Sequence, residues 1–214
     1  MVVLVLGAIM LLQASLSLSI SFGRLGAAIQ SDTLAVISAS WIGLRLLLWL
    51  AIVILWAANR RRSLFRMIIL INAFFTFGLF VNMLALVEIL FGYSLQAADS
   101  LIVDVVWMAV MNILIFSIWY WIIDPPGVNE ARRDDEPWDF LFPQRAGDLP
   151  HYADWQPRYT DYLFLAFTSS FAFSPTDTLP LTRRAKILMM IQAAISLVTI
   201  TAIAGSAINI LASG

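Results

Sequence analysis

Five long stretches of mostly apolar residues divide the chain, and polar segments separate them. A membrane-spanning helix needs about 20 such residues. Because a helix satisfies its backbone hydrogen bonds internally, we expect each stretch to cross the membrane as a helix. The pattern therefore predicts an all-α integral membrane protein with five transmembrane helices. The predicted spans are Val2–Ile20, Leu34–Ala58, Leu64–Phe91, Ser100–Ile123 and Ile187–Leu211.

Tryptophan and tyrosine residues stand near the ends of several stretches, as is typical of helices that meet the membrane interface. Trp41, Tyr93 and the run Trp119–Tyr120–Trp121 are examples. The first stretch, Val2–Ile20, could also be read as a secretory signal peptide. It lacks a positively charged segment before its apolar run, and its length suits a full crossing. We therefore expect it to be a transmembrane helix.

A sixth apolar run, Tyr162–Phe173, is too short to cross a membrane comfortably. It ends at Ser174–Pro175, and the charged turn Arg183–Lys186 precedes the last long stretch. A short helix, a turn and a full helix are the parts of a re-entrant hairpin, so we expect a re-entrant or interfacial, pore-helix-like segment here. The predicted domains are a four-helix transmembrane region (1–123), a polar, proline-rich interfacial loop (124–158) and the hairpin of re-entrant helix and final transmembrane helix (159–214).

The polar segment from Asp124 to Asp161 contains nine acidic residues and four arginines. Its prolines exclude one long helix. Within it, the run Trp138–Gln144 is aromatic and apolar. This run could dock on lipid headgroups, cover the cytoplasmic ends of the helices or form a surface for a partner. We expect an ordered loop that lies on the membrane interface.

The composition narrows the possible functions. Of the 214 residues, 61% are hydrophobic and 13% are charged, with a mean hydropathy of +0.85. Soluble domains carry about 25% charged residues. The chain has no cysteine and one histidine, His151, so it has no thiol nucleophile and no histidine cluster that could bind a metal. We expect a protein that is not an enzyme, has no cofactor, does not bind nucleic acid and has the lipid bilayer as its main partner.

The hairpin region resembles the pore module of potassium channels. That family has a short pore helix, a T-V-G-Y-G filter, the motif D-x-x-P-x-T and an inner helix. The present chain has Asp177-Thr-Leu-Pro180-Leu-Thr182 at the matching offset, and the match covers Tyr159–Leu211. The resemblance implies a homo-oligomer that transports monovalent cations. It places the ion pathway, equivalent to the filter, at Ala172, Phe173, Ser174, Pro175, Thr176 and Asp177.

The C-terminal half is also similar to an uncharacterised family of bacterial polytopic membrane proteins. Two segments carry this resemblance, Trp138-Asp-Phe-Leu-Phe-Pro-Gln144 and Phe173-Ser-Pro-Thr-Asp-Thr-Leu-Pro180. It implies a multi-pass protein of the bacterial inner membrane, and it implies no activity.

The filter positions depart from the potassium-channel pattern. A potassium filter aims successive backbone carbonyls at the ion, and its glycines permit the backbone angles that this requires. The corresponding segment here has no glycine, and Pro175 fixes its own φ near −65°. We therefore expect no standard potassium filter. If the hairpin conducts, its selectivity comes from other groups, such as Ser174, Thr176 and Asp177.

The distribution of basic residues predicts an orientation. With five spans, the arginine cluster at 60–66, the polar loop and the turn at 183–186 share one side, which collects 11 of the 13 basic residues. The positive-inside rule places that side in the cytoplasm, with the N-terminus inside and the C-terminus outside. A potassium-channel pore requires the opposite orientation. We follow the charge rule, under which a re-entrant hairpin would enter from the cytoplasm.

Three charged residues interrupt the predicted spans: Arg45, Glu88 and Asp104. Arg45 could pair with Glu88 or Asp104 or line a polar path, or it could snorkel to the interface. Either acidic residue could bind a cation or carry a proton, or lie solvated at the interface. The polar residues Asn72, Asn82 and Asn112 are expected to form hydrogen bonds between helices.

Asp177 is the strongest single candidate in the hairpin. It could bind an ion, cap the following helix or pair with Arg183 or Arg184. Thr182 is a second candidate for the helix cap. His151 is expected to be a solvated loop residue.

These observations leave three hypotheses for function. The first is a membrane protein with a channel-like pore module. The second is a non-transporting membrane scaffold or accessory subunit of a larger membrane complex. The third is a proton- or cation-coupled carrier that uses Arg45, Glu88 and Asp104, for which no inverted repeat is evident.

Overall fold

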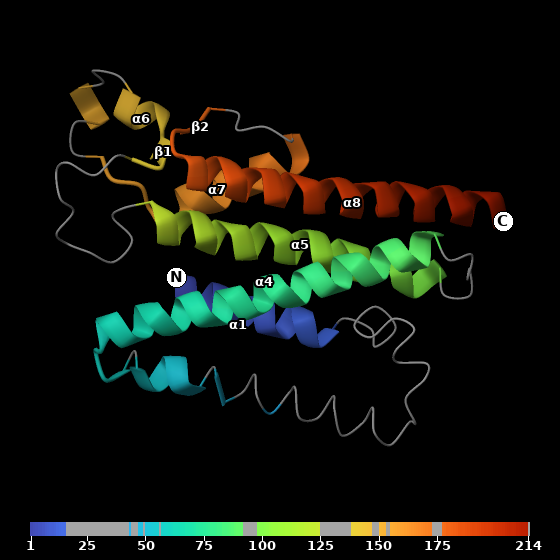
Figure 1. Ribbon diagram of the computed structural model, residues 1–214, viewed down its shortest axis with the longest axis horizontal. Coiled ribbons are helices and arrows are strands. Elements are labelled where there is room, and N and C mark those ends of the chain that lie inside the picture. The colour runs from blue at the N-terminus through green and yellow to red at the C-terminus, as the bar shows by residue number, and fades with distance from the viewer. Residues whose placement is uncertain are drawn as a thin grey trace. The chain divides into compact units, whose positions relative to one another are not determined.

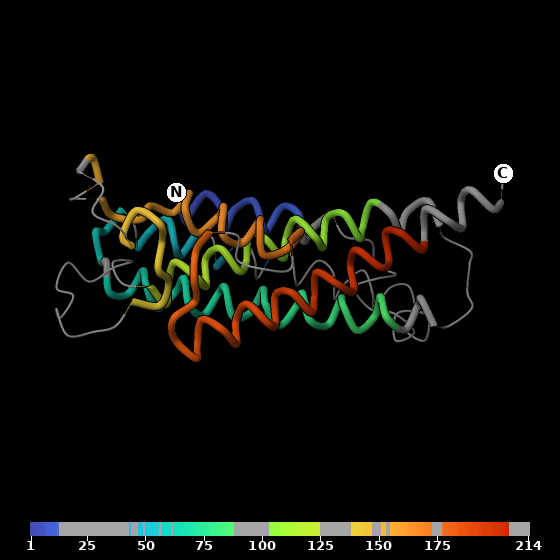
Figure 2. Tube along the Cα trace, turned by 90° about the horizontal axis from the view of Figure 1, so that it is seen from above, coloured from blue at the N-terminus to red at the C-terminus, as the bar shows by residue number. Residues whose placement is uncertain are grey.

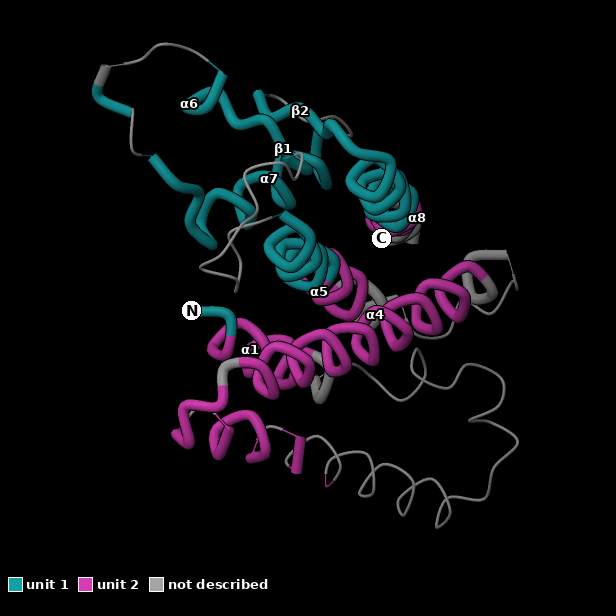
Figure 3. Tube along the Cα trace, turned by 60° about the vertical axis from the view of Figure 1, so that its left-hand side comes forward, with its two compact units in different colours: residues 1–2, 112–197 teal, residues 3–111, 198–214 magenta. Residues whose placement is uncertain are grey.

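The structure, a computed structural model, consists of helices and one small pair of strands in its described residues (Figure 1). Those residues are 1–15, 43, 47–48, 50–55, 57–91, 98–124, 138–146, 150–152, 155–172 and 177–213. They fall into two compact units, coloured separately in Figure 3. Unit 1 comprises residues 1–2 and 112–197, and unit 2 comprises residues 3–111 and 198–214.

Unit 2 contains most of helix α1 (Val2–Ser15), helix α4 (Arg61–Phe91) and the first half of helix α5 (Ala98–Ile123). The buried positions of α4 recur every three or four residues, as expected for one face of a helix. Large apolar side chains are also exposed on the other faces of α4, so this helix is apolar all round, as is typical of a helix in a membrane. The buried residues are Ile68, Ile71, Asn72, Phe75, Leu79, Asn82 and Leu86, and the exposed ones include Leu70, Phe77, Phe80 and Leu84.

The turn before α4 ends the preceding helical segment. Asn59 has a φ of 52°, in the left-handed region that asparagine tolerates better than most residues. The amide of Arg60 donates to the carbonyl of Leu55 across 3.1 Å, which satisfies one of the carbonyls at the helix end. Because the preceding helical segment ends at this turn, α4 can begin directly after it, at Arg61, three residues before the predicted start at Leu64.

Unit 1 contains the second half of α5, helix α7 (Tyr159–Ala172) and the first half of helix α8 (Arg183–Ser213). Strands β1 (Phe140–Leu141) and β2 (Leu179–Pro180) pair antiparallel, with Phe140 opposite Pro180 and Leu141 opposite Leu179. The short helix α6 (Pro143–Ala146) and the 3-10 turn η1 (Pro150–Tyr152) belong to the polar loop.

Helix α7 is amphipathic, as the run Tyr162–Phe173 predicts, but it begins earlier, at Tyr159. The Asp161 carboxylate accepts a hydrogen bond from the Arg158 amide at 2.6 Å, which satisfies a donor at the start of the helix. One face of α7 is buried and the opposite face is aromatic and exposed. The buried residues are Tyr159, Tyr162, Leu165, Ala166, Ser169 and Ser170, and the exposed ones include Phe164, Phe167 and Phe171.

The chain enters and leaves the α7 hairpin at the same end of α5. Tyr162, near the start of α7, and Arg184, at the start of α8, both lie at the C-terminal end of α5. From there α7 (orange) and α8 (red) extend alongside each other (Figures 1 and 2). A segment that includes β2 therefore returns the chain from the far end of α7 to the start of α8.

Three described helical segments are long and apolar enough to cross a membrane: Arg62–Val87, Val103–Ile123 and Arg183–Gly205. They lie in α4, α5 and α8 and correspond to three of the five predicted spans. The chain is therefore compatible with a membrane-embedded, helical protein. α8 begins at Arg183 rather than at the predicted Ile187, because Thr182 caps it.

The other two predicted spans are described in part. In the first, α1 includes a shorter apolar stretch, Val2–Leu12, and residues 16–20 lie outside the described part. The second, Leu34–Ala58, is described at positions 43, 47–48, 50–55 and 57–58.

Candidate functional site

The most connected polar site in unit 1 lies where α5 ends. Asp124 directly follows α5, and its side chain is fully buried. One carboxylate oxygen accepts from the backbone amides of Asp139 at 3.0 Å and Phe140 at 3.3 Å. The other accepts from the Tyr162 hydroxyl at 2.7 Å and from Arg145 Nη1 at 3.4 Å. A single side chain thus joins the end of α5 to β1, α6 and α7.

The electrostatics of Asp124 reflect two opposing effects. Burial raises the pKa of the Asp124 carboxyl group, because a buried charge loses its hydration. The Tyr162 hydroxyl, the Arg145 guanidinium and the amides of Asp139 and Phe140 lower the same pKa but offset the effect of burial only in part, so the pKa of Asp124 stays above its ordinary value. All four groups donate hydrogen bonds or carry positive charge, and they therefore stabilise the ionised form that they surround.

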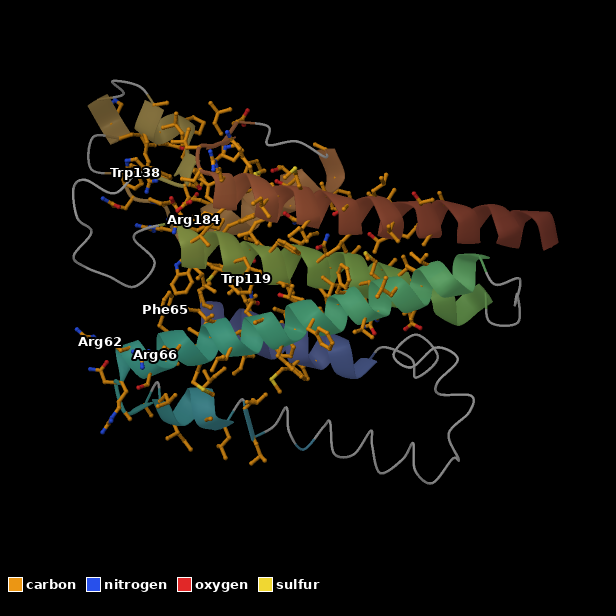
Figure 4. All side chains as sticks on the ribbon, viewed as in Figure 1. Arg62, Phe65, Arg66, Trp119, Trp138 and Arg184 are labelled. Carbon is orange, nitrogen blue, oxygen red and sulfur yellow. The ribbon has the colours of Figure 1, made fainter. Side chains whose placement is uncertain are left out.

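A second buried carboxylate lies beside the first. The Asp139 side chain is fully buried and accepts from Arg184 Nε at 2.6 Å and from Arg184 Nη2 at 2.5 Å. It also accepts from the Thr182 hydroxyl, and its backbone carbonyl accepts from the Leu181 amide at 2.9 Å. The two-pronged contact with arginine is the strong geometry for a carboxylate. Asp139 therefore fixes the polar loop to the start of α8, where Figure 4 labels Arg184.

Aromatic rings enclose the guanidinium of Arg145. Its central carbon lies 3.3 Å from the centre of the Trp138 ring, 5.7 Å from that of Phe142 and 5.8 Å from that of Trp155. Cations within about 6 Å of such ring faces are attracted by the ring quadrupole. The exposed fraction of the Arg145 side chain is 8%. The aromatic run 138–144 therefore packs around an arginine of its own loop, and Phe142 also packs edge-on against Tyr162.

We call Asp124, Asp139, Arg145, Tyr162, Thr182 and Arg184 the carboxylate cluster. It holds both ends of the hairpin and the polar loop against α5.

A second polar site lies between α5, α7 and α8. The Gln192 side chain is fully buried and donates through Nε2 to the Ala166 carbonyl and the Ser170 hydroxyl, both at 2.8 Å. Its carbonyl oxygen accepts from the Tyr120 hydroxyl. One amide side chain thus bridges all three helices, since Tyr120 belongs to α5 and the α7 partners are one turn apart.

Asn112 extends this Gln192 cluster along α5. Its Nδ2 donates to the Ser196 hydroxyl at 2.8 Å and to the Gln192 backbone carbonyl at 3.3 Å. This confirms the expectation that Asn112 forms hydrogen bonds between helices. Nearby, Ser117 of α5 shares a hydrogen bond of 2.5 Å with the Tyr159 hydroxyl of α7. These polar groups of the three helices are therefore bonded to one another or to backbone, whereas Asn112 Oδ1 is buried without a hydrogen-bond partner among the described residues.

The expected filter positions are described only in part. Ala172 is the last residue of α7 and is exposed, and Asp177 lies outside the helices and is also exposed. Phe173, Ser174, Pro175 and Thr176 lie outside the described residues.

Asp177 and Thr182 were the two candidates for the cap of α8, and the contacts at the start of α8 distinguish them. The Thr182 hydroxyl accepts from the amide of Ala185 at 3.3 Å, so Thr182 is the cap. Arg184, suggested as a partner of Asp177, instead pairs with Asp139. Asp177 is exposed, and its pairing with Arg183, the other suggested partner, stays a prediction.

Of the three predicted intramembrane charges, the side chain of Asp104 alone is among those that the structure describes. Arg45 lies outside the described residues, and Glu88 belongs to α4 but its side chain is not described. Asp104 is buried in the first half of α5, with 3% of its surface exposed. Asn72 and Asn82 are buried in α4.

His151 is exposed in η1, as expected for a solvated loop residue. Throughout the part of the chain that the structure describes, no group of three or more His, Cys, Asp or Glu side chains could hold a metal ion.

Sequence reasoning missed the centres of both polar clusters. Asp124 and Asp139 counted only as charges in a polar loop, and Gln192 was not singled out. The available signals were an aspartate directly after the aromatic end of a span, followed by Pro125–Pro126, and an isolated amide in an apolar helix.

Removing the Asp124 carboxylate is expected to destabilise unit 1 strongly. Asp124→Ala leaves the Arg145 charge and two amides without their acceptor, at a cost of about 3–5 kcal/mol. Tyr162→Phe removes one donor and should cost about 1–3 kcal/mol. Thermal or denaturant unfolding of the purified protein in detergent measures both losses of stability.

The matched control is Asp177→Ala at an exposed position, whose free energy of unfolding is expected within about 0.5 kcal/mol of the wild type. Equal effects at Asp124 and Asp177 would contradict a structural role for the buried carboxylate.

Removing the Gln192 amide should loosen the contact between α5, α7 and α8. Gln192→Leu keeps a similar volume but leaves the Tyr120 hydroxyl and the Ala166 carbonyl without their partner. We expect a loss of about 1–2 kcal/mol in the free energy of unfolding, near the upper end for such bonds between membrane helices. Met190→Leu, at an exposed site on the same helix, is the control and should leave stability unchanged. A neutral Gln192→Leu variant would show that apolar packing alone holds the three helices together.

Comparison with protein-family models gives no match, and no curated protein or solved structure is significantly similar to the chain.

Proposed function

We propose that this protein is a non-transporting scaffold or accessory subunit of a larger membrane complex. The observation that carries the proposal is the internal pairing of polar groups in α5, α7 and α8. A conducting path is lined by polar or charged groups that replace the hydration of the ion. Here Gln192, Tyr120 and Ser170 bond to one another or to the backbone of unit 1.

The outward surfaces of the hairpin support the same proposal. The exposed face of α7 carries Phe164, Phe167 and Phe171, of which the last two rings lie 4.9 Å apart. Aromatic side chains are enriched where proteins bind other proteins. The sequence between Ala172 and Asp177 also lacks glycine, which a filter of the potassium type needs. A partner helix is therefore the expected occupant of the α7 aromatic face.

The proposed topology has five membrane-spanning helices and one short re-entrant helix, α7. Entry and exit of the hairpin at one end of α5 support the re-entrant path. The positive-inside rule favours a cytoplasmic position for that end and for the arginines near residue 60. The proposed location is the inner membrane of a bacterium.

A channel-like pore module is the second candidate. The order of elements supports it, because the short helix α7 is followed by a segment containing β2 and then by the long helix α8, as in a pore module. Such a pore would form between copies of the chain and would conduct monovalent cations past Asp177, without a standard potassium filter.

Single cysteines test the topology, since the native chain has none. Ser63→Cys, Ala146→Cys and Ser213→Cys are labelled with an impermeant thiol reagent in oriented membranes. We expect labelling of Ser63→Cys and Ala146→Cys from the cytoplasmic side and of Ser213→Cys from the outside. The reverse pattern would contradict the charge rule and favour the orientation of a potassium-channel pore. Labelling of all three from one side would contradict five spans.

Two measurements separate the scaffold from the channel. Purified protein in liposomes should pass no monovalent cations, with a known ionophore as the positive control. A photoreactive residue at Phe167 in native membranes should form protein adducts of defined mass, whereas one at Met190 on α8 should form lipid adducts. Cation flux that Asp177→Asn abolishes would overturn the scaffold and establish the channel. Only lipid adducts at Phe167 would also count against the scaffold.

A further inference from the structure

We propose that the N-terminal third of α8 binds an anionic phospholipid, whose headgroup contacts Arg183 and Lys186. The inference rests on the membrane insertion proposed above. It concerns a face of α8 opposite to the one that Gln192 occupies, and it is independent of whether the protein acts as a scaffold or a channel.

The charge at this end of α8 is positive and exposed. From Thr178 to the last residue the sequence has three basic residues and no acidic one. All three are exposed, and Arg184 also pairs with Asp139. Arg183 and Lys186 are three positions apart in a helix and therefore lie on the same face. They form a compact positive site suited to a phosphate group.

An apolar stripe continues from the two basic side chains along the same face. Ile187 is 51% exposed, Met190 is 64% exposed and Leu197 is 57% exposed, and the small residue Ala194 between them is exposed as well. At 1.5 Å per residue, the helix from Lys186 to Leu197 is about 16 Å long. That is close to half of the roughly 30 Å hydrocarbon thickness, the depth of one leaflet.

The polarity of this surface matches that of one phospholipid molecule. Basic side chains lie at one end, where the headgroup would be, and aliphatic side chains cover about the length of an acyl chain. Basic residues at a membrane surface attract anionic lipids, and the attraction grows with each Lys or Arg. The opposite face of α8, with Ala185, Met189, Gln192 and Ser196, is buried in the protein. The stripe is therefore the face of α8 that a lipid can reach.

Binding of defined lipids to the full chain tests the proposal. The protein is purified in detergent and titrated with phosphatidylglycerol or phosphatidylcholine, and bound lipid is counted by native mass spectrometry. We expect tighter binding of phosphatidylglycerol. The double variant R183Q/K186Q should weaken phosphatidylglycerol binding about 30-fold, the effect of removing two such charges. Phosphatidylcholine binding should change little.

The matched control removes two exposed arginines from the start of another helix. R62Q/R66Q makes the same change in net charge on α4, where both residues are exposed, and should leave the affinity for phosphatidylglycerol within about twofold of the wild type. Equal weakening by both double variants would overturn the proposal, because it would indicate attraction to net charge alone. The absence of any preference for phosphatidylglycerol would overturn it too.

Cysteine labelling in the same preparation separates this proposal from the proposed topology. Protein that shows the expected labelling at residues 63, 146 and 213 but no lipid preference would refute the lipid site alone. Protein with a different labelling pattern would refute the topology on which the site depends.

Discussion

Asp124 is a carboxylate buried at the end of α5, a helix long enough to cross a membrane. Such a carboxylate needs hydrogen-bond donors around it. Leaving water costs an ionised carboxylate several kcal/mol unless hydrogen bonds and an opposite charge compensate. The compensating groups come from three separate segments: the amides of Asp139 and Phe140 at the start of β1, Arg145 of α6 and Tyr162 of α7. Compensating one charge thus fixes the polar loop and the entrance of the hairpin. Asp139 extends the arrangement to Thr182 and Arg184, so the exit of the hairpin is fixed as well.

The two polar clusters stabilise different parts of unit 1. The carboxylate cluster positions the ends of α7 and α8, and the Gln192 cluster joins the same helices to α5 farther along their length. In a membrane, lipid chains are as apolar as leucine, so polar contacts and close packing determine which helices associate. The small residues Ala166 and Ser170 let Gln192 approach the α7 backbone. This arrangement leaves the aromatic face of α7 and the aliphatic stripe of α8 exposed.

Much of the helical architecture follows directly from the sequence. Stretches of about 20 apolar residues can satisfy their backbone in lipid only as helices, which is why α4, α5 and α8 match predicted spans to within a few residues. The apolar run Tyr162–Phe173, followed by Ser174–Pro175, predicted a short helix, and the structure has α7 over Tyr159–Ala172. Helix starts were less accurate, because they depend on individual groups: Asn59 before α4, Asp161 for α7 and Thr182 for α8.

Partner choice, in contrast, was decided only by the tertiary structure. Charge and spacing placed Asp177 beside Arg183 and Arg184 as a plausible pair, yet Arg184 binds Asp139, which is 45 residues away in sequence. Apart from the position of Asp124 directly after a predicted span, nothing in the local pattern distinguishes Asp124 and Asp139 from the other acidic residues of the polar loop, because burial depends on how distant segments pack. The sequence alone determined that this is a helical chain suited to a membrane, since hydropathy and length are local properties. Which polar groups are buried together was decided by the fold, since each needs donors that separate segments bring to it.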